Sequence, residues 1–150
     1  MLTVRRRILV SAPRDSVREY LSDLSHIAHC EPKVDAIEVS PGADVARASG
    51  RFFGLPWSGS FRFEKTRDGG YRGVMVEGPL RRMECGVALR PVAGGTVVEH
   101  DEAYELPLIL RPLSPLIRLW LDGTLEDELG AVKEGAEALN RRLQLKNLDA

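Results

Sequence analysis

The chain has 150 residues, of which 43% are hydrophobic and 29% are charged, and its formal net charge is −1. A chain of this length buries roughly 70% of its unfolded surface on folding, so a single domain over residues 1–150 needs neither a disulfide framework nor a structural metal. The near-neutral charge excludes the clustered cations of a nonspecific nucleic-acid binder, and we expect no nucleic-acid partner.

The two cysteines, Cys30 and Cys85, are too few for a disulfide framework and lack CxxC spacing, so we expect two reduced, packed thiols. The N-terminal apolar stretch ends at Ala12-Pro13 and is shorter than a signal peptide requires. No uncharged run approaches the roughly 18 residues of a membrane span. The sequence therefore predicts a cytoplasmic protein without an integral membrane segment.

Residues 3–11 alternate imperfectly between apolar and charged side chains, which predicts a first strand. Ser11-Ala12-Pro13 then offers a polar cap and a proline suited to the first turn of a helix over about residues 13–22. A second short helix is expected from Ser25 to His29, because Glu31-Pro32 disfavours helical backbone.

From Val34 to Leu106, runs of alternating or β-branched residues are separated by short turns that contain Gly or Pro. This punctuation predicts an antiparallel meander. Its six strands are expected at residues 34–39, 45–53, 57–66, 71–76, 80–89 and 96–106. The N-terminal strand raises the total to seven.

After Ser114-Pro115 the hydrophobic period changes from 2 to 3.6, which predicts a helix over residues 115–144. Such a helix is about 45 Å long, so it must cross the whole domain and lie against a long curved sheet. Its apolar stripe comprises Leu121, Leu125, Leu129, Val132, Ala136, Leu139 and Leu143. The predicted fold class is α+β: a seven-stranded curved antiparallel sheet around a long C-terminal helix, with two short helices after the first strand.

Several segments resemble the polyketide cyclase/dehydrase and lipid-transport superfamily, which includes START and Bet v 1 domains (SRPBCC). Three segments carry the resemblance. They are an opening with Ala-Pro, Val and Ser-Asp at residues 8–17 and 21–23, a Pro-x-Val-x-x-Ile-Glu strand at residues 31–38, and the last strand with its exit at residues 95–99 and 104–107. The resemblance covers almost the whole chain and implies one helix-grip domain. A weaker resemblance links residues 53–61 to the accessory proteins encoded beside carbon monoxide dehydrogenases.

In the family that the sequence resembles, the sheet wraps the helix incompletely and leaves an apolar cavity, and such pockets typically enclose about 300–1,000 Å³. Alternation places apolar side chains on one face of each central strand, and these faces are expected to point towards the helix. Plain core packing is the alternative for each residue. The candidate ligand-binding residues are Trp57, Phe61, Phe63, Met83, Cys85, Val87, Val98, His100, Tyr104 and Trp120.

The richest polar stretch places His100, Glu102 and Tyr104 on one face of the last strand. Inside a cavity, this row is a candidate for acid–base catalysis, because histidine titrates near neutrality and a neighbouring carboxylate tunes it. The alternative, which the sequence alone favours, is a solvated strand that pairs with surface arginines. Alternation does not decide which face of the strand is internal.

His26, His29 and Cys30 lie within one helical turn, but a zinc site needs further ligands that only Cys85 or His100 could supply. We therefore expect no metal. A glycine-rich nucleotide loop and a GxSxG elbow are both missing from the sequence, and no other cofactor is expected.

Three functions fit these observations. The first is binding, and transport or presentation, of a small hydrophobic molecule such as a lipid, isoprenoid quinone or polyketide, without catalysis. The second is a cyclase or dehydratase, which requires His100 to face inward. The third is a protein-interaction module with a solid core and an exposed apolar patch at residues 106–113, a stretch that could equally form a lid or a homodimer contact.

Overall fold

The computed structural model describes residues 1–42 and 44–149. The chain begins with β1 (Leu2–Val10), α1 (Arg14–Ser22) and α2 (His26–Cys30). The meander follows as β2 (Val34–Val39), β3 (Val45–Phe52), β4 (Leu55–Lys65), β5 (Tyr71–Glu77), β6 (Met83–Val92) and β7 (Gly95–Tyr104). A 3-10 helix, η1 (Leu108–Leu113), leads into α3 (Ser114–Asp149). The predicted α+β helix-grip fold is confirmed.

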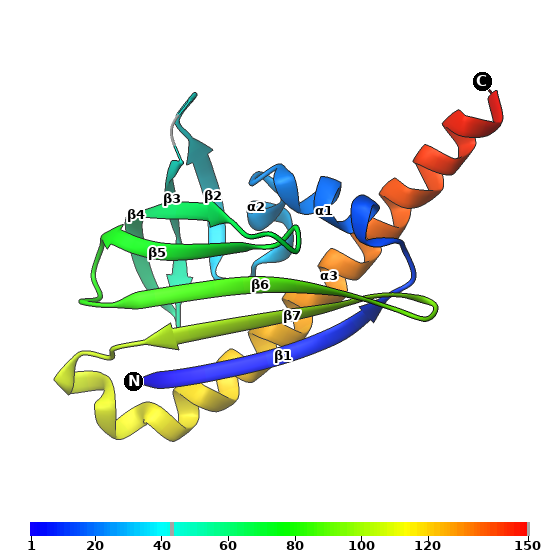
Figure 1. Cartoon of the computed structure of the whole chain (residues 1–150). Helices are drawn as coiled ribbons and strands as arrows, with labels where there is room; N and C mark the ends of the chain where they lie inside the picture. Colours follow the sequence, from blue (N-terminus) through cyan, green and yellow to red (C-terminus); the bar gives the residue numbers. More distant parts are fainter. Residues whose placement is uncertain (43, 150) are drawn as a thin grey trace.

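The seven strands form one antiparallel sheet in the order β1-β7-β6-β5-β4-β3-β2. Each meander strand pairs with the next, and β1 closes the far edge against β7. Figure 1 shows the sheet curling, so that β2 and β3 stand steeply to β6 and β7 while α3 runs across the concave side. The helix contacts β1 most extensively, and α1 and α2 pack against it from above.

Two local predictions are wrong. Ser11 does not cap α1, because Pro13 is the N-cap residue and its side chain offers no acceptor, while the Ser11 backbone N–H donates to the Glu137 carboxylate at 2.8 Å. Strand β6 begins at Met83 rather than at residue 80 and continues to Val92, where it turns directly into β7. A tight two-residue hairpin explains the longer strand.

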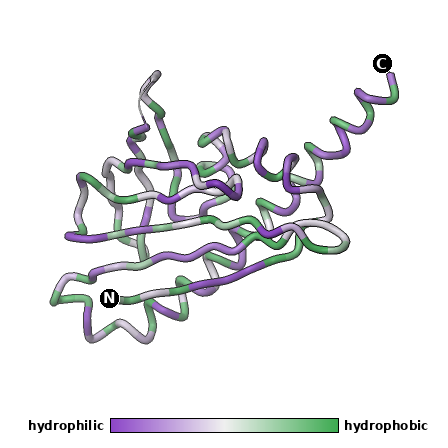
Figure 2. The backbone as a smooth tube through the Cα atoms, viewed as in Figure 1, coloured by the Kyte–Doolittle hydropathy of each residue, from purple (hydrophilic) through white to green (hydrophobic). Residues whose placement is uncertain are grey.

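Helix α3 spans 36 residues, about 54 Å, and continues past the predicted end at residue 144. The predicted stripe is buried from Leu121 to Ala136. Residues 144–149 are exposed and project beyond the sheet (Figure 1). Hydrophobic and hydrophilic residues alternate to the end of this projection in Figure 2, and they include Leu148 at 80% exposure.

The core is divided into two clusters along the helix. One packs around Leu129 and Val132 and joins α1 to β6 and β7. The other packs around Ile117, Leu121 and Leu125 and lies beneath the steep part of the sheet. The curl of the sheet lifts much of β3 and β4 away from α3, so these strands and the helix enclose a space between their contacts.

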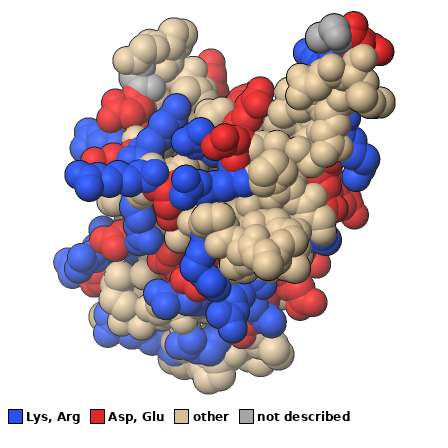
Figure 3. Space-filling view, turned by 45° about the vertical axis from the view of Figure 1, so that its right-hand side comes forward, with Lys and Arg blue, Asp and Glu red and all other residues tan. Residues whose placement is uncertain are grey.

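Charged side chains of both signs cover much of the face shown in Figure 3, with Lys and Arg gathered over the body of the molecule. Of the helices that the structure describes, none combines the length and the apolar character needed to cross a lipid bilayer.

Candidate functional site

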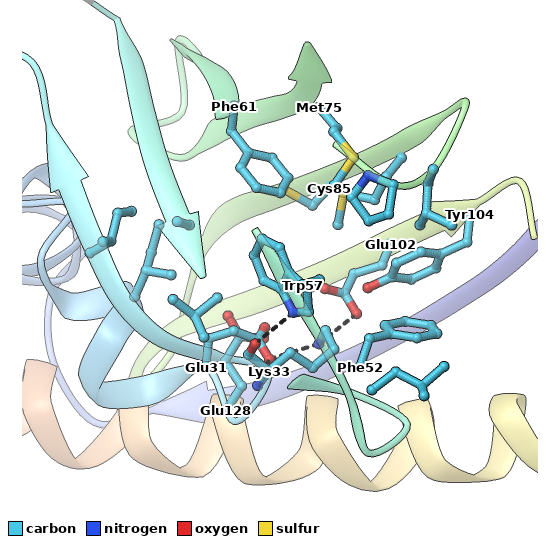
Figure 4. A pocket seen from close by; sticks show the side chains of 18 of the residues that line it. Glu31, Lys33, Phe52, Trp57, Phe61, Met75, Cys85, Glu102, Tyr104 and Glu128 are labelled. Atoms are coloured by element: carbon cyan, nitrogen blue, oxygen red, sulfur yellow. Dashed lines mark hydrogen bonds and ion pairs between the residues drawn. The ribbon is translucent and has the colours of Figure 1, made fainter. Parts of the chain in front are cut away.

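A cavity of about 440 Å³ lies between the curved sheet and α3. Its volume falls within the range typical of small-molecule sites. Most of its wall is apolar, and the side chains come from α2, β2 to β7, η1 and α3. Figure 4 shows Trp57, Phe61, Met75 and Cys85 around this space, with acidic and basic side chains gathered at one end.

The aromatic strip predicted on β4 lines the cavity. Trp57, Phe61 and Phe63 follow one another along the strand, with ring centroids 5.9 Å and 6.2 Å apart. Met83 and Cys85 on β6 line the same space, as do His100 and Tyr104 on β7.

Three of the candidate ligand-binding residues do not line this cavity. Val87 and Val98 belong to the core cluster around Leu129 and pack directly within it. Trp120 turns its indole against Phe52, at a centroid distance of 5.1 Å, and supports the wall from behind. Alternation correctly placed the two valines on the face of the sheet that points towards α3. It did not show that they lie beside Leu129, where the sheet packs directly on the helix.

The sequence did not single out the opposite wall of the cavity. Ala48 and Phe52 on β3 line it, together with Ile37 on β2 and Leu110 on η1. The alternating burial of β3 follows the period of 2 that predicted the strand. The steep angle of β2 and β3 brings these residues over the cavity, and no local pattern reveals that angle.

Two basic and three acidic side chains meet at the polar end of the cavity. Glu31 and Lys33 come from the segment before β2, His100 and Glu102 from β7, and Glu128 from α3. The Lys33 ammonium lies 2.7 Å from Glu31 Oε1 and 3.1 Å from Glu102 Oε1. His100 Nε2 lies 3.1 Å from Glu128 Oε2 and 3.5 Å from Glu102 Oε2. All five residues are buried.

The row that carries His100 and Glu102 therefore faces the interior, and the favoured prediction of a solvated strand is wrong for it. The opposite row of β7 is the one that pairs with surface arginines, as that prediction described. Glu99 lies 3.6 Å from Arg5, and Asp101 lies 3.0 Å from Arg72 on the outer surface. Charged residues lie on both faces of β7, so the sequence pattern does not reveal which face points into the interior.

The backbone of Lys33 is fixed by close contacts with neighbouring strands. Its carbonyl oxygen accepts hydrogen bonds from Trp57 Nε1–H at 3.1 Å and from the Arg51 backbone N–H at 3.2 Å. Gly50 makes this approach possible, because a Cβ at that position would overlap the Lys33 carbonyl. The missing side chain at Gly50 thus fixes the Lys33 backbone, from which the ammonium reaches the polar end of the cavity.

Burial and the neighbouring charges set the protonation of this cluster. Burial, reinforced by Glu128, raises the pKa of Glu31 well above its usual value. Burial opposes a charge on Lys33 and on His100, but nearby carboxylates outweigh it and raise both pKa values. Burial also opposes ionisation of Glu102 and Glu128, yet Lys33 and His100 lower their pKa values. The cluster thus favours two compensated ion pairs beside a neutral Glu31.

The Tyr104 hydroxyl adds an uncharged polar group to the same end of the cavity. Its ring is 2% exposed, and its oxygen has no hydrogen-bond partner among the residues that the structure describes. Burial raises the pKa of Tyr104 well above its usual value, so the group stays a hydroxyl that can both donate and accept.

His26, His29 and Cys30 do not converge on one point. His26 is buried with Nδ1 2.7 Å from the Asp23 carbonyl, and His29 is exposed. Cys30 Sγ lies 3.1 Å from the Tyr20 hydroxyl. His26 and Cys30 serve the packing of α2.

The sequence profile described as polyketide cyclase / dehydrase and lipid transport matches residues 1–137. The chain belongs to this family. The resemblance to the polyketide cyclase/dehydrase and lipid-transport superfamily is thereby confirmed. A search of curated proteins gave no match.

Solved structures of family-like proteins share the fold. TTHA0849 from Thermus thermophilus superposes with a TM-score of 0.79 at 22% identity, covering 91% of this chain and 97% of that one. The Zhui aromatase/cyclase from Streptomyces sp. R1128 gives 0.66 at 20% identity, over 90% and 93% of the chains. A START superfamily protein from Mycobacterium smegmatis gives 0.67 at 12% identity, over 94% and 98%. At these identities the likeness establishes the fold alone.

Proposed function

We propose that the protein binds a small hydrophobic molecule with a hydrogen-bonding group, such as a lipid, an isoprenoid quinone or a polyketide. The observation that carries this proposal is the cavity of about 440 Å³, apolar over most of its wall and polar at one end. Burying the apolar part of a ligand there is worth about 25 cal/mol per Å². Tyr104 would bind the ligand's polar group, because its buried hydroxyl has no partner among the described residues.

The two tryptophans provide a direct test because only one of them lines the cavity. Trp120→Phe leaves Trp57 as the sole tryptophan, and Trp57→Phe leaves Trp120 behind the wall. Titration with fatty acids, quinones and aromatic polyketides should change the emission of the Trp120→Phe protein saturably, and that of the Trp57→Phe protein much less. If no member of the panel binds, and native mass spectrometry finds the purified protein empty, the proposal fails.

A cavity-filling variant localises the binding. Ala48→Leu places three further carbons in the cavity and should weaken binding at least tenfold, on the basis of about 1.4 kcal/mol per factor of ten. Ala88→Leu adds the same atoms on the exposed outer face of β6 and should leave affinity unchanged. Equal affinities for both variants would place the ligand elsewhere.

Acid–base catalysis in the same cavity is a second candidate function, favoured by the inward position of His100. Its ring lines the cavity beside Glu102, and Tyr104 lines the same cavity. A proton donor and a carboxylate next to an apolar pocket suit the enolisation steps of a cyclase or dehydratase. Mass spectrometry of each bound ligand after incubation distinguishes the two functions, because a pure binder returns its ligand unchanged.

The protein-interaction hypothesis is weakened by the cavity, because it predicted a solid core. Of the apolar stretch at residues 106–113, Leu108–Leu113 forms η1, with Ile109 84% exposed, whereas Leu106 is buried. Leu110 and Ile109 also line the cavity, so η1 borders the binding space as well as the solvent. A homodimer through this stretch remains a prediction.

A further inference from the structure

Three potential metal ligands face one another at the polar end of the cavity. His100 Nε2 lies 3.1 Å from Glu128 Oε2 and 3.5 Å from Glu102 Oε2. In a tetrahedral zinc site with bonds of about 2.0–2.1 Å, neighbouring ligand atoms are about 3.4 Å apart. The observed separations therefore match those of ligands around a shared cation.

The orientation of the histidine ring gives an independent indication. His100 Nδ1 lies 2.9 Å from the Gly86 carbonyl oxygen, which can only accept, so Nδ1 carries the proton. In the neutral ring, Nε2 then directs a lone pair towards the two carboxylates, and this buried atom has no hydrogen-bond partner among the described residues. Histidines that bind metals usually donate the other ring N–H to a carbonyl or carboxylate, as this one does.

Lys33 contacts an oxygen of Glu102 other than the one that faces His100. Its ammonium contacts Glu102 through Oε1, whereas His100 faces Oε2 of the same carboxylate. The ammonium also contacts Glu31 Oε1 at 2.7 Å. Without a metal the cluster has no net charge, because Glu31 is neutral and the His100 ring is protonated. Release of both protons on metal binding would leave two negative charges, which one divalent cation would balance.

We propose that His100, Glu102 and Glu128 bind one divalent transition-metal ion such as Zn²⁺. Ligand atoms of these residues and of Glu31 all lie within 4.8 Å of one another, so Glu31 is placed to complete a set of four. One imidazole with carboxylates suits Zn²⁺, Mn²⁺ or Fe²⁺ better than Mg²⁺. All four residues border the apolar cavity, which gives the ion an entry path and makes a ligand oxygen a possible replacement for Glu31. The proposal does not depend on the identity of the hydrophobic ligand.

The test uses the full chain after treatment with a chelator and dialysis. Titration with Zn²⁺ should show one site per chain by calorimetry, and Co²⁺ should give the visible absorption of a low-coordinate nitrogen and oxygen site. Glu128→Gln and His100→Gln should each weaken the affinity at least 100-fold. Glu99→Gln, on the outer face of the same strand, should leave it unchanged.

A measurement on the unmutated chain covers the case in which a variant fails to fold. In nitrogen-15 NMR spectra of the histidine rings, Zn²⁺ should shift the Nε2 resonance of His100 while Nδ1 stays protonated. Absence of Zn²⁺ and Co²⁺ binding at millimolar metal, or equal affinity in Glu128→Gln, would overturn the proposal. In that case a protonated His100 ring, and not a metal ion, would compensate the charges of Glu102 and Glu128.

Discussion

Removing the ammonium of Lys33 is expected to destabilise the fold strongly. Lys33→Met keeps a stem of similar length but deletes the charge that contacts Glu31 at 2.7 Å and Glu102 at 3.1 Å. The Lys33 side chain is 5% exposed, so water cannot replace the lost partner. Breaking a buried ion pair from one side typically costs about 3–5 kcal/mol, because the remaining charge stays buried and uncompensated.

The matched control removes a cation from the outer surface of the same sheet. Arg72 contacts Asp101 at 3.0 Å but is 48% exposed, so Arg72→Met should cost at most about 1 kcal/mol. Both variants are unfolded in urea, which does not screen charges, with a chelator present so that no cation takes the place of the ammonium. The difference between the two losses measures the effect of burial at nearly constant contact distance.

A double variant tests the cause of the loss. Glu102→Gln in the Lys33→Met background removes the stranded carboxylate, and about 2 kcal/mol of the stability should return, within the usual range for coupled neighbours. A loss below about 1 kcal/mol in Lys33→Met, or no recovery in the double variant, would show that the cluster does not need its lysine and would refute the charge assignment given above.

Two further predictions concern local packing and protonation. Gly50→Ala should lower the free energy of unfolding by about 1–3 kcal/mol, because the new Cβ would overlap the Lys33 carbonyl. The Cβ of Gly123→Ala on α3 would meet nothing within 4 Å, so this variant should be more stable by up to about 1 kcal/mol. Thermal unfolding measures both changes. Burial lowers the pKa of His26 in the folded protein. The contribution of the neutral ring to the free energy of unfolding is therefore present above the unfolded-state pKa of about 6.5, and it is lost as the pH falls through the folded-state value. His26→Gln should therefore flatten the decline of unfolding free energy between about pH 7 and pH 5, and exposed His29→Gln should not; equal slopes would contradict this reasoning.

The fold could be predicted from sequence because its signals are local. Glycine and proline mark nearly every turn of the meander, and the change of period after Ser114-Pro115 marks the long helix. Errors arise where tertiary contacts decide. The Ser11 backbone bonds to Glu137 on α3, a residue far away in the chain, and the register with β7 extends β6 to Val92. Neither contact leaves a local pattern.

The cavity wall was predictable in part for the same reason. Alternation identifies which residues of a strand point inward, so Trp57, Phe61 and Phe63 were found. It does not identify where along α3 the sheet lifts away from the helix. That position separates Cys85, which lines the cavity, from Val87, which packs into the core two residues later.

The polar cluster left one readable signal in the sequence, on the stripe of α3. Glu126, Asp127 and Glu128 follow one another, but only Glu128 falls at the stripe interval between Leu125 and Val132, and only Glu128 is buried. A carboxylate at an apolar position must find a cation, because its burial without a partner is prohibitive. The stripe therefore predicts a buried positive group elsewhere in the chain. That group is His100, together with the Lys33 that pairs with Glu102. Its identity depends on the curl of the sheet, which brings β7 and the segment before β2 to the stretch of α3 around Glu128.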